Sequence, residues 1–123
     1  MPLRVLIVDD HTIIALAVGG ILQKLGHSVI ATVTTGREAV DWAAQHRPDL
    51  VLMDIELKGD MDGVAAAIAI KNSLGISSVF FSGHLDEETR RRAAEAEPIA
   101  FLAKTASTET ISEVLKGIES GAR

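Results

Sequence analysis

Cysteine is absent from this 123-residue sequence, which excludes disulfide bonds and thiolate metal sites. No apolar run reaches membrane-spanning length, and the start, Met1-Pro2-Leu3-Arg4, lacks the hydrophobic region of a signal peptide. Basic residues number 12 against 17 acidic ones, and the net charge of -5 argues against a broad nucleic-acid surface. We therefore expect a cytoplasmic protein that makes no direct contact with nucleic acid or membrane.

Aromatic residues make up only 3% of the chain, and no glycine-rich phosphate loop follows the first apolar run. Both absences argue against a flavodoxin-like module that binds a flavin or a nucleotide. Hydrophobic residues nevertheless form 47% of the sequence, enough for one continuous core. We expect residues 1–123 to form a single domain, and the sequence leaves open whether it is a complete protein or part of a longer one.

Short apolar runs alternate with stretches of helical periodicity along the whole chain. The runs are Val5 to Val8, Val29 to Val33, Leu50 to Met53, Val79 to Phe81 and Ile99 to Ala103. Strands that are almost wholly apolar are typical of a parallel sheet covered on both faces. The sequence thus predicts an α/β fold, a five-stranded parallel sheet with helices on both sides.

Capping residues predict where the helices begin and end. A stripe of apolar residues places the first helix at Thr12 to Leu25, closed by Gly26. The other expected starts are Thr35 with Glu38, Asp62 or Gly63, Asp86, and Ser107 or Thr108. Pro48 and Pro98 limit the second and the fourth helix.

Five polar residues lie where the apolar strands end: Asp9, Asp10, Asp54, Ser82 and Lys104. The carboxyl ends of parallel strands meet at one edge of a sheet, and ligands bind there in open α/β folds. Any one of these residues has an ordinary explanation, as Asp10 would if it only capped the first helix. Their joint position at one edge favours a functional site.

Three carboxylates brought together repel one another, and a hard divalent cation, Mg²⁺, relieves that repulsion through oxygen ligands. Asp54 then has the position of a nucleophile that attacks phosphorus and forms an acyl phosphate. Lys104 would neutralise phosphate oxygens and Ser82 would donate a hydrogen bond. Positioning and charge neutralisation are what phosphoryl transfer requires.

Four fragments, in this order on five strand-helix units, resemble the response-regulator receiver domain of two-component systems. They are Val5-Leu6-Ile7-Val8-Asp9-Asp10, Leu52-Met53-Asp54-Ile55 with Met61-Asp62-Gly63, Phe81-Ser82-Gly83, and Phe101-Leu102-Ala103-Lys104. The resemblance implies a flavodoxin-like receiver fold with strand order 2-1-3-4-5. It also implies a Mg²⁺ ion held by Asp9, Asp10, Asp54 and the backbone carbonyl of Glu56.

The resemblance further implies that Asp54 accepts a phosphoryl group from a sensor histidine kinase or a histidine phosphotransfer protein. Ser82 and Phe101 would be the switch pair, the serine moving toward the phosphoryl group and the ring following inward. Helix 4, strand 5 and helix 5 would then present the changed face to an unidentified output partner or a relay. Such a domain is regulatory rather than a metabolic enzyme, although it catalyses phosphorylation and dephosphorylation of its own Asp54.

The sequence departs from the common family pattern at two places. Thr105 follows Lys104 where the family commonly has proline, so a cis peptide bond is not expected there. The loop from Glu56 to Gly63 is one residue longer than the commonest version, so the family's usual loop shape and kinase contacts are not carried over to this sequence. Glu56 itself, two positions after the acceptor, is expected to change the rate at which water reaches the acyl phosphate.

The histidines and one basic run receive no chemical role. No metal-ligand spacing relates the four histidines, His11, His27, His46 and His84, so we expect no zinc site. We assign them to the surface or to helix caps. Of the four, only His84 is near enough to Ser82 in the sequence to border the site. Arg90 to Arg92 predict a solvated helix face paired with Glu87, Glu88 and Glu95, or else a partner contact.

A different class of function, a haloacid-dehalogenase-like phosphohydrolase, also uses a strand-end aspartate with magnesium and a lysine. Those enzymes place a second aspartate two residues after the nucleophile. Glu56 stands at that position here, and the chain has no room for a cap domain. The sequence therefore favours the regulatory phospho-acceptor over the enzyme.

Overall fold

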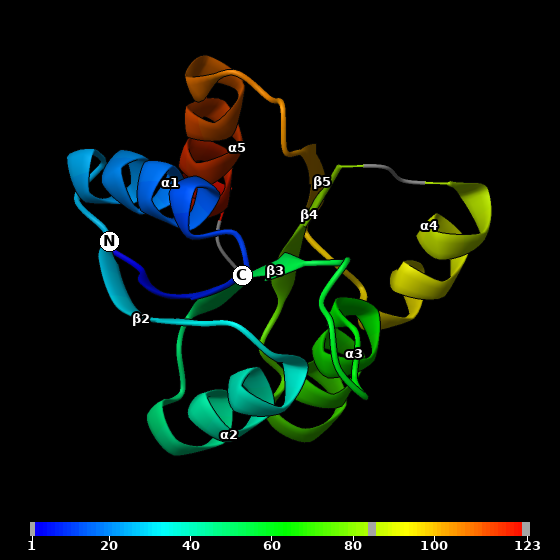
Figure 1. The fold of residues 1–123 in the computed structure, drawn as a ribbon. Coiled ribbons are helices and arrows are strands. Elements are labelled where there is room, and N and C mark those ends of the chain that lie inside the picture. The colour runs from blue at the N-terminus through cyan, green and yellow to red at the C-terminus, as the bar shows by residue number, and fades with distance from the viewer. Residues whose placement is uncertain (1, 84–85, 122–123) are drawn as a thin grey trace.

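The computed structural model describes residues 2–83 and 86–121, and side chains as far as Ile118. Strands and helices alternate along the chain (Figure 1). The strands are β1 Arg4–Val8, β2 Ser28–Val33, β3 Leu50–Asp54, β4 Ser78–Ser82 and β5 Ala100–Ala103. The helices are α1 Thr12–Lys24, α2 Gly36–His46, α3 Gly63–Leu74, α4 Glu87–Ala93 with the 3-10 turn Ala94–Ala96, and α5 Thr108–Gly121.

The sheet has the order β2-β1-β3-β4-β5, and every neighbouring pair is parallel. The predicted α/β class and the strand order implied by the resemblance are confirmed. Helices α1 and α5 cover one face of the sheet, while α2, α3 and α4 lie on the other (Figure 1). The strand order changes direction between β1 and β3, so their carboxyl ends border the crevice where such sheets bind ligands.

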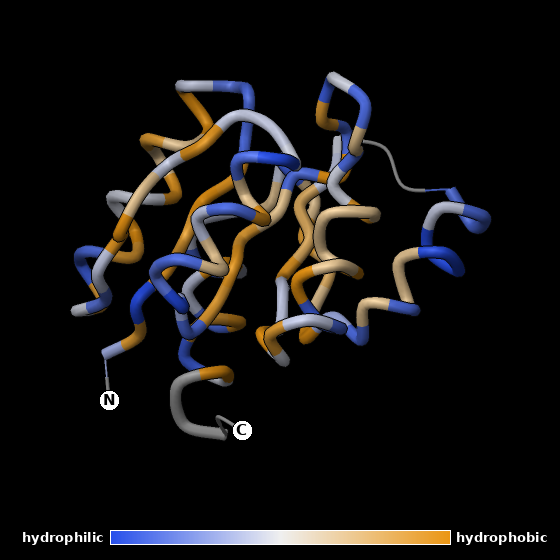
Figure 2. Tube along the Cα trace, turned by 90° about the horizontal axis from the view of Figure 1, so that it is seen from below, coloured by the Kyte–Doolittle hydropathy of each residue, from blue (hydrophilic) through white to orange (hydrophobic). Residues whose placement is uncertain are grey.

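The central strand β3 is buried along its whole length, as an apolar parallel strand should be. Its side chains alternate between two cores: Val51 and Met53 pack toward α2 and α3, and Leu50 and Leu52 toward α1 and α5. In Figure 2 the strands accordingly form a hydrophobic centre between more polar helices. Asp54 extends this buried strand, so a carboxylate ends a run of core residues.

The helix boundaries follow the predicted caps. The Thr35 side chain accepts a hydrogen bond from Glu38 N at the start of α2. Asp62 accepts from Ala65 N at the start of α3, and Asp86 accepts from Thr89 N at the start of α4. Helix α1 ends at Lys24, one residue before the predicted end, and Gly26 follows with a φ of 91°. The chain thus leaves α1 through the left-handed conformation that glycine adopts without strain.

Helix α4 is short and polar, and Ala93 is its only buried residue. It lies at the edge of the fold in Figure 1, and Figure 2 shows its residues as hydrophilic. Arg92 donates from Nη1 and Nη2 to Asp62, at 2.9 and 3.0 Å. Arg92 is exposed and its charge interacts with that of the predicted partner Glu95, but its hydrogen-bonding fork reaches Asp62 at the start of α3, which the sequence did not predict.

The loop between β3 and α3 is closed by a hydrogen bond between its two ends and is held to α2 by an ion pair. Gly63 N donates to Ile55 O at 3.2 Å, and Arg37 of α2 lies 3.1 Å from Asp60. Gly63 also faces the backbone closely, because a Cβ there would lie 1.9 Å from the carbonyl oxygen of Asp54. The loop that follows Asp54 is thus held against the end of β3.

Two smaller findings concern the described residues alone. They contain no cis peptide bond, so the Lys104–Thr105 bond is trans as predicted. Within the same ranges, no helix combines the length and the apolar character needed to cross a membrane.

Candidate functional site

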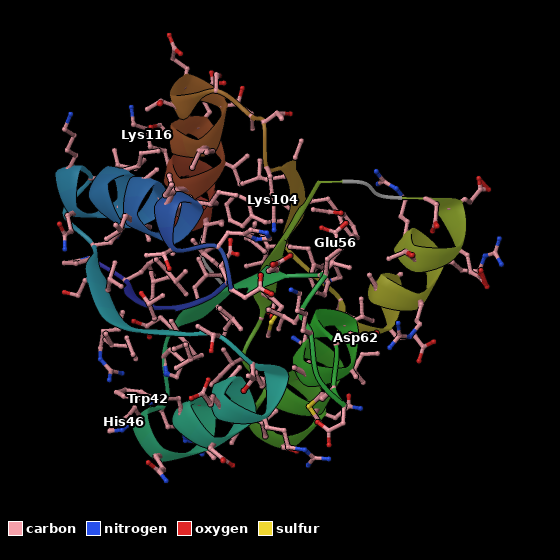
Figure 3. All side chains as sticks on the ribbon, viewed as in Figure 1. Trp42, His46, Glu56, Asp62, Lys104 and Lys116 are labelled. Atoms are coloured by element: carbon pink, nitrogen blue, oxygen red, sulfur yellow. The ribbon has the colours of Figure 1, made fainter. Side chains whose placement is uncertain are left out.

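Three of the predicted site residues converge at the carboxyl edge of the sheet. Asp9 follows β1, Asp54 ends β3 and Lys104 follows β5. Lys104 Nζ lies 3.0 Å from Asp54 Oδ2 and 3.8 Å from Asp9 Oδ1. All three side chains are buried, with 6%, 0% and 9% of their surface exposed. Figure 3 shows Lys104 reaching inward from β5 toward this edge.

The surroundings of Asp54 shift the pKa of its carboxyl group. Burial raises the pKa of its carboxyl, while Lys104 and a hydrogen bond from the backbone N–H of Glu56 lower it in part. That N–H lies 2.9 Å from Asp54 Oδ1. The pKa remains raised on balance, so additional positive charge beside Asp54 would favour its ionised form.

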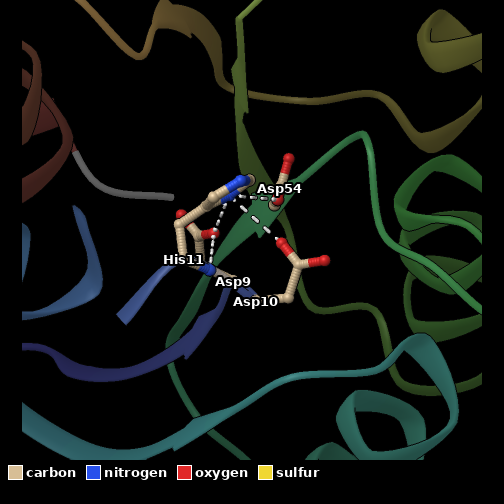
Figure 4. A group of neighbouring side chains, drawn as sticks. All are labelled: Asp9, Asp10, His11 and Asp54. Atoms are coloured by element: carbon tan, nitrogen blue, oxygen red, sulfur yellow. Dashed lines mark hydrogen bonds and ion pairs between the residues drawn. The ribbon is translucent and has the colours of Figure 1, made fainter. Parts of the chain in front are cut away.

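His11 belongs to the same cluster, which the sequence did not predict. Its Nδ1 lies 3.1 Å from Asp9 Oδ1, 3.1 Å from Asp10 Oδ1 and 3.8 Å from Asp54 Oδ2 (Figure 4). It also lies 3.1 Å from Lys104 Nζ. His11 occupies the N-cap position of α1, but its side chain makes no capping hydrogen bond. His11 is exposed and stands at the helix cap, as predicted, but its contacts with the carboxylates were not predicted, and its place directly after Asp9-Asp10 was the available signal.

These residues fit a bound divalent cation. Asp9, Asp10, His11 and Asp54 each offer one ligand atom, and the four atoms lie within 4.8 Å of one another. Three of them are carboxylate oxygens, the ligands that Mg²⁺ prefers. The predicted contribution of the Glu56 carbonyl stays a prediction.

Ser82, at the end of β4, is buried, and its hydroxyl is directed to Glu56. Ser82 Oγ donates to Glu56 Oε2 at 3.0 Å, and the next amide, Gly83 N, donates to Glu56 Oε1 at 3.1 Å. Figure 3 shows Glu56 on the connection that leaves β3, close to the β4 end. The structure thus brings Ser82 to the site edge, with a carboxylate as hydrogen-bond partner.

Phe101 of β5 lies partly buried beside Phe80, with ring centroids 5.7 Å apart. The guanidinium of Arg90 lies 4.9 Å from the centroid of the Phe101 ring. A cavity of about 210 Å³ adjoins both Phe101 and Ser82. The predicted switch pair therefore borders one cavity, and Arg90, like Arg92, contacts a residue outside its own helix.

The remaining histidines lie away from the site or outside the described residues. His27 is buried, and its Nδ1 accepts from Leu3 N at 3.0 Å, so its assignment to the surface or to a cap was wrong. His46 is exposed and stacks on Trp42 with centroids 4.0 Å apart. His84 lies outside the described residues.

The sequence matches a known family across most of its length. The family model of the response regulator receiver domain matches residues 5–116. The chain belongs to this family. The residues of the candidate site thus lie within a receiver domain, and both the observed fold and the sequence resemblance agree with this family.

Relatives and solved structures support the same assignment. The response regulator protein VraR of Staphylococcus saprophyticus is 31% identical over 118 residues, which cover 94% of this chain and 56% of that protein. The transcriptional regulatory protein PdtaR of Mycobacterium tuberculosis is 32% identical over 119 residues, with 97% and 56% covered. The receiver domain therefore spans about half the length of these relatives.

Two solved structures illustrate the fold. The signal receiver domain of a modulated diguanylate cyclase from Desulfovibrio desulfuricans superposes with a TM-score of 0.87 at 33% identity, covering 94% of this chain and 92% of that one. A CheY-like receiver domain from Methanospirillum hungatei also gives 0.87, at 26% identity and with 98% and 96% covered. The arrangement of all five strand-helix units is shared with receiver domains.

Proposed function

We propose that this receiver domain is a phosphorylation switch whose acceptor is Asp54. The observation that carries the proposal is the buried Asp54 carboxylate at the end of β3, with Lys104 Nζ 3.0 Å from Oδ2 and Asp9 beside it. A nucleophile, a counter-charge and an acidic cation site thus meet at one point. Family membership supports the same role.

In the proposed reaction an oxygen of Asp54 attacks the phosphorus of a phosphohistidine. A P–O bond to Asp54 forms, the P–N bond breaks, and the released imidazole takes up a proton. Lys104 is placed to neutralise the phosphoryl oxygens, and the Glu56 N–H fixes the other carboxylate oxygen at 2.9 Å. The protein's contribution is position and charge, as phosphoryl transfer requires.

Asp9, Asp10 and Asp54 are the residues proposed to hold Mg²⁺, with the Glu56 carbonyl as a further oxygen. When bound, the ion supplies positive charge for the phosphoryl oxygens and removes the repulsion among the carboxylates. Asp9 and Asp54 are almost fully buried, so their charges interact strongly when no cation neutralises them.

Ser82 and Phe101 are proposed as the switch. The Ser82 hydroxyl would turn to the phosphoryl group, and the Phe101 ring would move into the cavity that the two residues share. Their movement would alter α4, β5 and α5, where an output partner or a relay protein binds. The phosphoryl donor is proposed to be a sensor histidine kinase or a histidine phosphotransfer protein.

The proposal describes a regulatory domain rather than a metabolic enzyme. A haloacid-dehalogenase-like enzyme has a second aspartate two residues after the nucleophile, but here that position holds Glu56, whose carboxylate accepts from Ser82 and Gly83. The domain would instead catalyse only its own phosphorylation and dephosphorylation. Output of the whole protein, a cytoplasmic location and the lack of direct nucleic-acid contact stay predictions.

Acetyl phosphate tests the acceptor directly. The purified domain is incubated with acetyl phosphate and Mg²⁺, and intact mass is measured for the wild type, Asp54→Ala and the exposed control Asp41→Ala. We expect one labile phosphoryl adduct in the wild type and in Asp41→Ala, and none in Asp54→Ala. An adduct that persists in Asp54→Ala, or is absent from the wild type, contradicts the proposal.

Dephosphorylation tests the predicted kinetic role of Glu56. We expect Glu56→Asn to change the rate at which the acyl phosphate hydrolyses, because the carboxylate lies next to the acceptor loop and its hydrogen bonds to Ser82 and Gly83 would be altered. Loss of the adduct is followed by intact mass after the acetyl phosphate is removed. An unchanged rate contradicts this role.

A further inference from the structure

Among the residues that the structure describes, Glu56 links the acceptor to the end of β4 through three hydrogen bonds. Its backbone N–H donates to Asp54 Oδ1 at 2.9 Å. Its carboxylate accepts from the Ser82 hydroxyl at 3.0 Å and from the Gly83 amide at 3.1 Å. One residue therefore contacts both the group that would be phosphorylated and the hydroxyl that would respond.

Each of the two donors that Glu56 engages, the Ser82 hydroxyl and the Gly83 amide, has a single proton to donate. A serine hydroxyl carries one proton and a backbone amide carries one, so each makes one strong donor bond at a time. Under the proposed function, the phosphoryl group on Asp54 requires the Ser82 proton. A phosphoryl oxygen and the Glu56 carboxylate cannot both receive that proton.

We propose that Glu56 is a built-in competitor of the phosphoryl group. In the unphosphorylated domain its two carboxylate oxygens take the place of phosphoryl oxygens as acceptors for Ser82 and Gly83. This holds Ser82 in the resting arrangement. The inference rests on the proposed function and adds to it a stabilised resting state that phosphorylation must displace.

The charges on each side make this competition effective. Hydrogen bonds to a carboxylate are stronger than those between neutral groups, so the resting contacts oppose movement of Ser82. Phosphorylation replaces the single negative charge of the Asp54 carboxylate with a phosphoryl group that carries about two, on the other side of the same donors. The phosphoryl group then both attracts Ser82 and repels Glu56, which gives the switch two states instead of a gradual shift.

Release of Ser82 has a direct route to Phe101. The cavity of about 210 Å³ is lined by Ser82, Gly83, Phe101 and Arg90, among others. A change at Ser82 and Gly83 therefore alters the walls of the space next to the Phe101 ring. Arg90, 4.9 Å from that ring, connects the change to α4.

Binding of trifluoroberyllate, a small mimic of the phosphoryl group, tests the competition at equilibrium. Its dissociation constant is measured with Mg²⁺ for the wild type and Glu56→Ala, with Glu113→Ala as a control that removes the same charge from α5. We expect Glu56→Ala to bind on the order of tenfold more tightly, about what one charge-assisted bond contributes. Glu113→Ala should bind as the wild type does.

A second pair of variants separates competition from a general charge effect. In a Ser82→Ala background the hydroxyl is absent, so removing Glu56 should improve binding by much less than in the wild-type background. The inference is overturned if Glu56→Ala improves binding equally in both backgrounds, or does not improve it at all. The proposed function still stands in that case, provided that the wild type forms an Asp54-dependent adduct. A wild type that forms no adduct overturns both.

Discussion

The guanidinium of Arg92 and the carboxylate of Asp62 face each other through two parallel hydrogen bonds, 2.9 and 3.0 Å long. Asp62 also caps α3 by accepting from Ala65 N at 2.8 Å. Since Ala93 is the only buried residue of α4, the helix has little apolar contact with the rest of the domain. The fork between Arg92 and Asp62 therefore fastens α4 to the loop that follows Asp54.

Replacing Arg92 should loosen α4 and weaken the domain slightly. Both side chains are about half exposed, so the pair is screened, and we expect Arg92→Ala to lower the free energy of unfolding by about 1 kcal/mol at most. Arg92→Lys should lose most of the same contribution, because lysine cannot form the fork. Urea unfolding measures both, with Arg91→Ala as the control. Equal effects of Arg91→Ala and Arg92→Ala contradict the role of the fork.

The same pair predicts a dependence on pH. Burial raises the pKa of Asp62, but hydrogen bonds from Arg92 and backbone amides outweigh it and leave the pKa lowered. A lowered folded-state pKa adds stability that is present above the unfolded value of about 3.9 and lost as pH falls through the folded value. Wild type and Arg92→Ala should therefore differ at neutral pH and converge in acid. A difference that persists at pH 2 contradicts the prediction.

Gly63 should tolerate no side chain. A Cβ there would lie 1.9 Å from Asp54 O and 2.9 Å from Ile55 Cα, both backbone atoms that cannot turn aside. We expect Gly63→Ala to lower the free energy of unfolding by about 2 kcal/mol or more and to weaken phosphorylation, because Asp54 must shift. Gly117→Ala is the matched control: no heavy atom lies within 4 Å of a Cβ there, and helix propensity should make it neutral or stabilising. Similar unfolding of both variants contradicts the close approach.

The fold was predictable because its signals are local. Apolar strands, the cap residues Thr35, Asp62 and Asp86, and the glycine after α1 each specify a boundary from a few neighbouring residues. The carboxyl-edge position of Asp54 follows from the parallel sheet alone, since every strand ends at the same side.

What the sequence missed depends on contacts between distant segments. His11 meets Lys104, 93 positions away, and Glu56 meets Ser82, 26 positions away. Arg92 had glutamates nearby on its own helix but pairs with Asp62, which is 30 positions away. No local pattern specifies such partners, because side-chain direction at a strand end depends on the packing of the whole sheet edge.

Asp54 should limit stability when no cation is present. Because burial raises the pKa of Asp54, its ionised form is unfavourable in the folded domain, and Asp54→Asn should raise the free energy of unfolding in chelator. Saturating Mg²⁺ should make the wild type more stable than Asp54→Asn. A cation at 100 times its dissociation constant adds about 2.7 kcal/mol to the free energy of unfolding of the protein that binds it. Thermal unfolding with and without Mg²⁺ measures both effects, with Asp41→Asn as the control. A Mg²⁺ effect of equal size in Asp54→Asn contradicts the site.

His11 should matter more for some cations than for others. Its Nδ1 lies 3.1 Å from two carboxylate oxygens of the cluster, and imidazole is a good ligand for Co²⁺ but a poor one for Mg²⁺. We expect His11→Ala to weaken Co²⁺ binding on the order of tenfold while Mg²⁺ affinity changes little. Calorimetric titration gives both affinities, and the visible spectrum of Co²⁺ reports loss of a nitrogen ligand. His46→Ala, an exposed histidine on α2, controls for surface binding. Equal losses of Co²⁺ and Mg²⁺ affinity would show that His11 acts on the site through its charge or packing and not as a ligand.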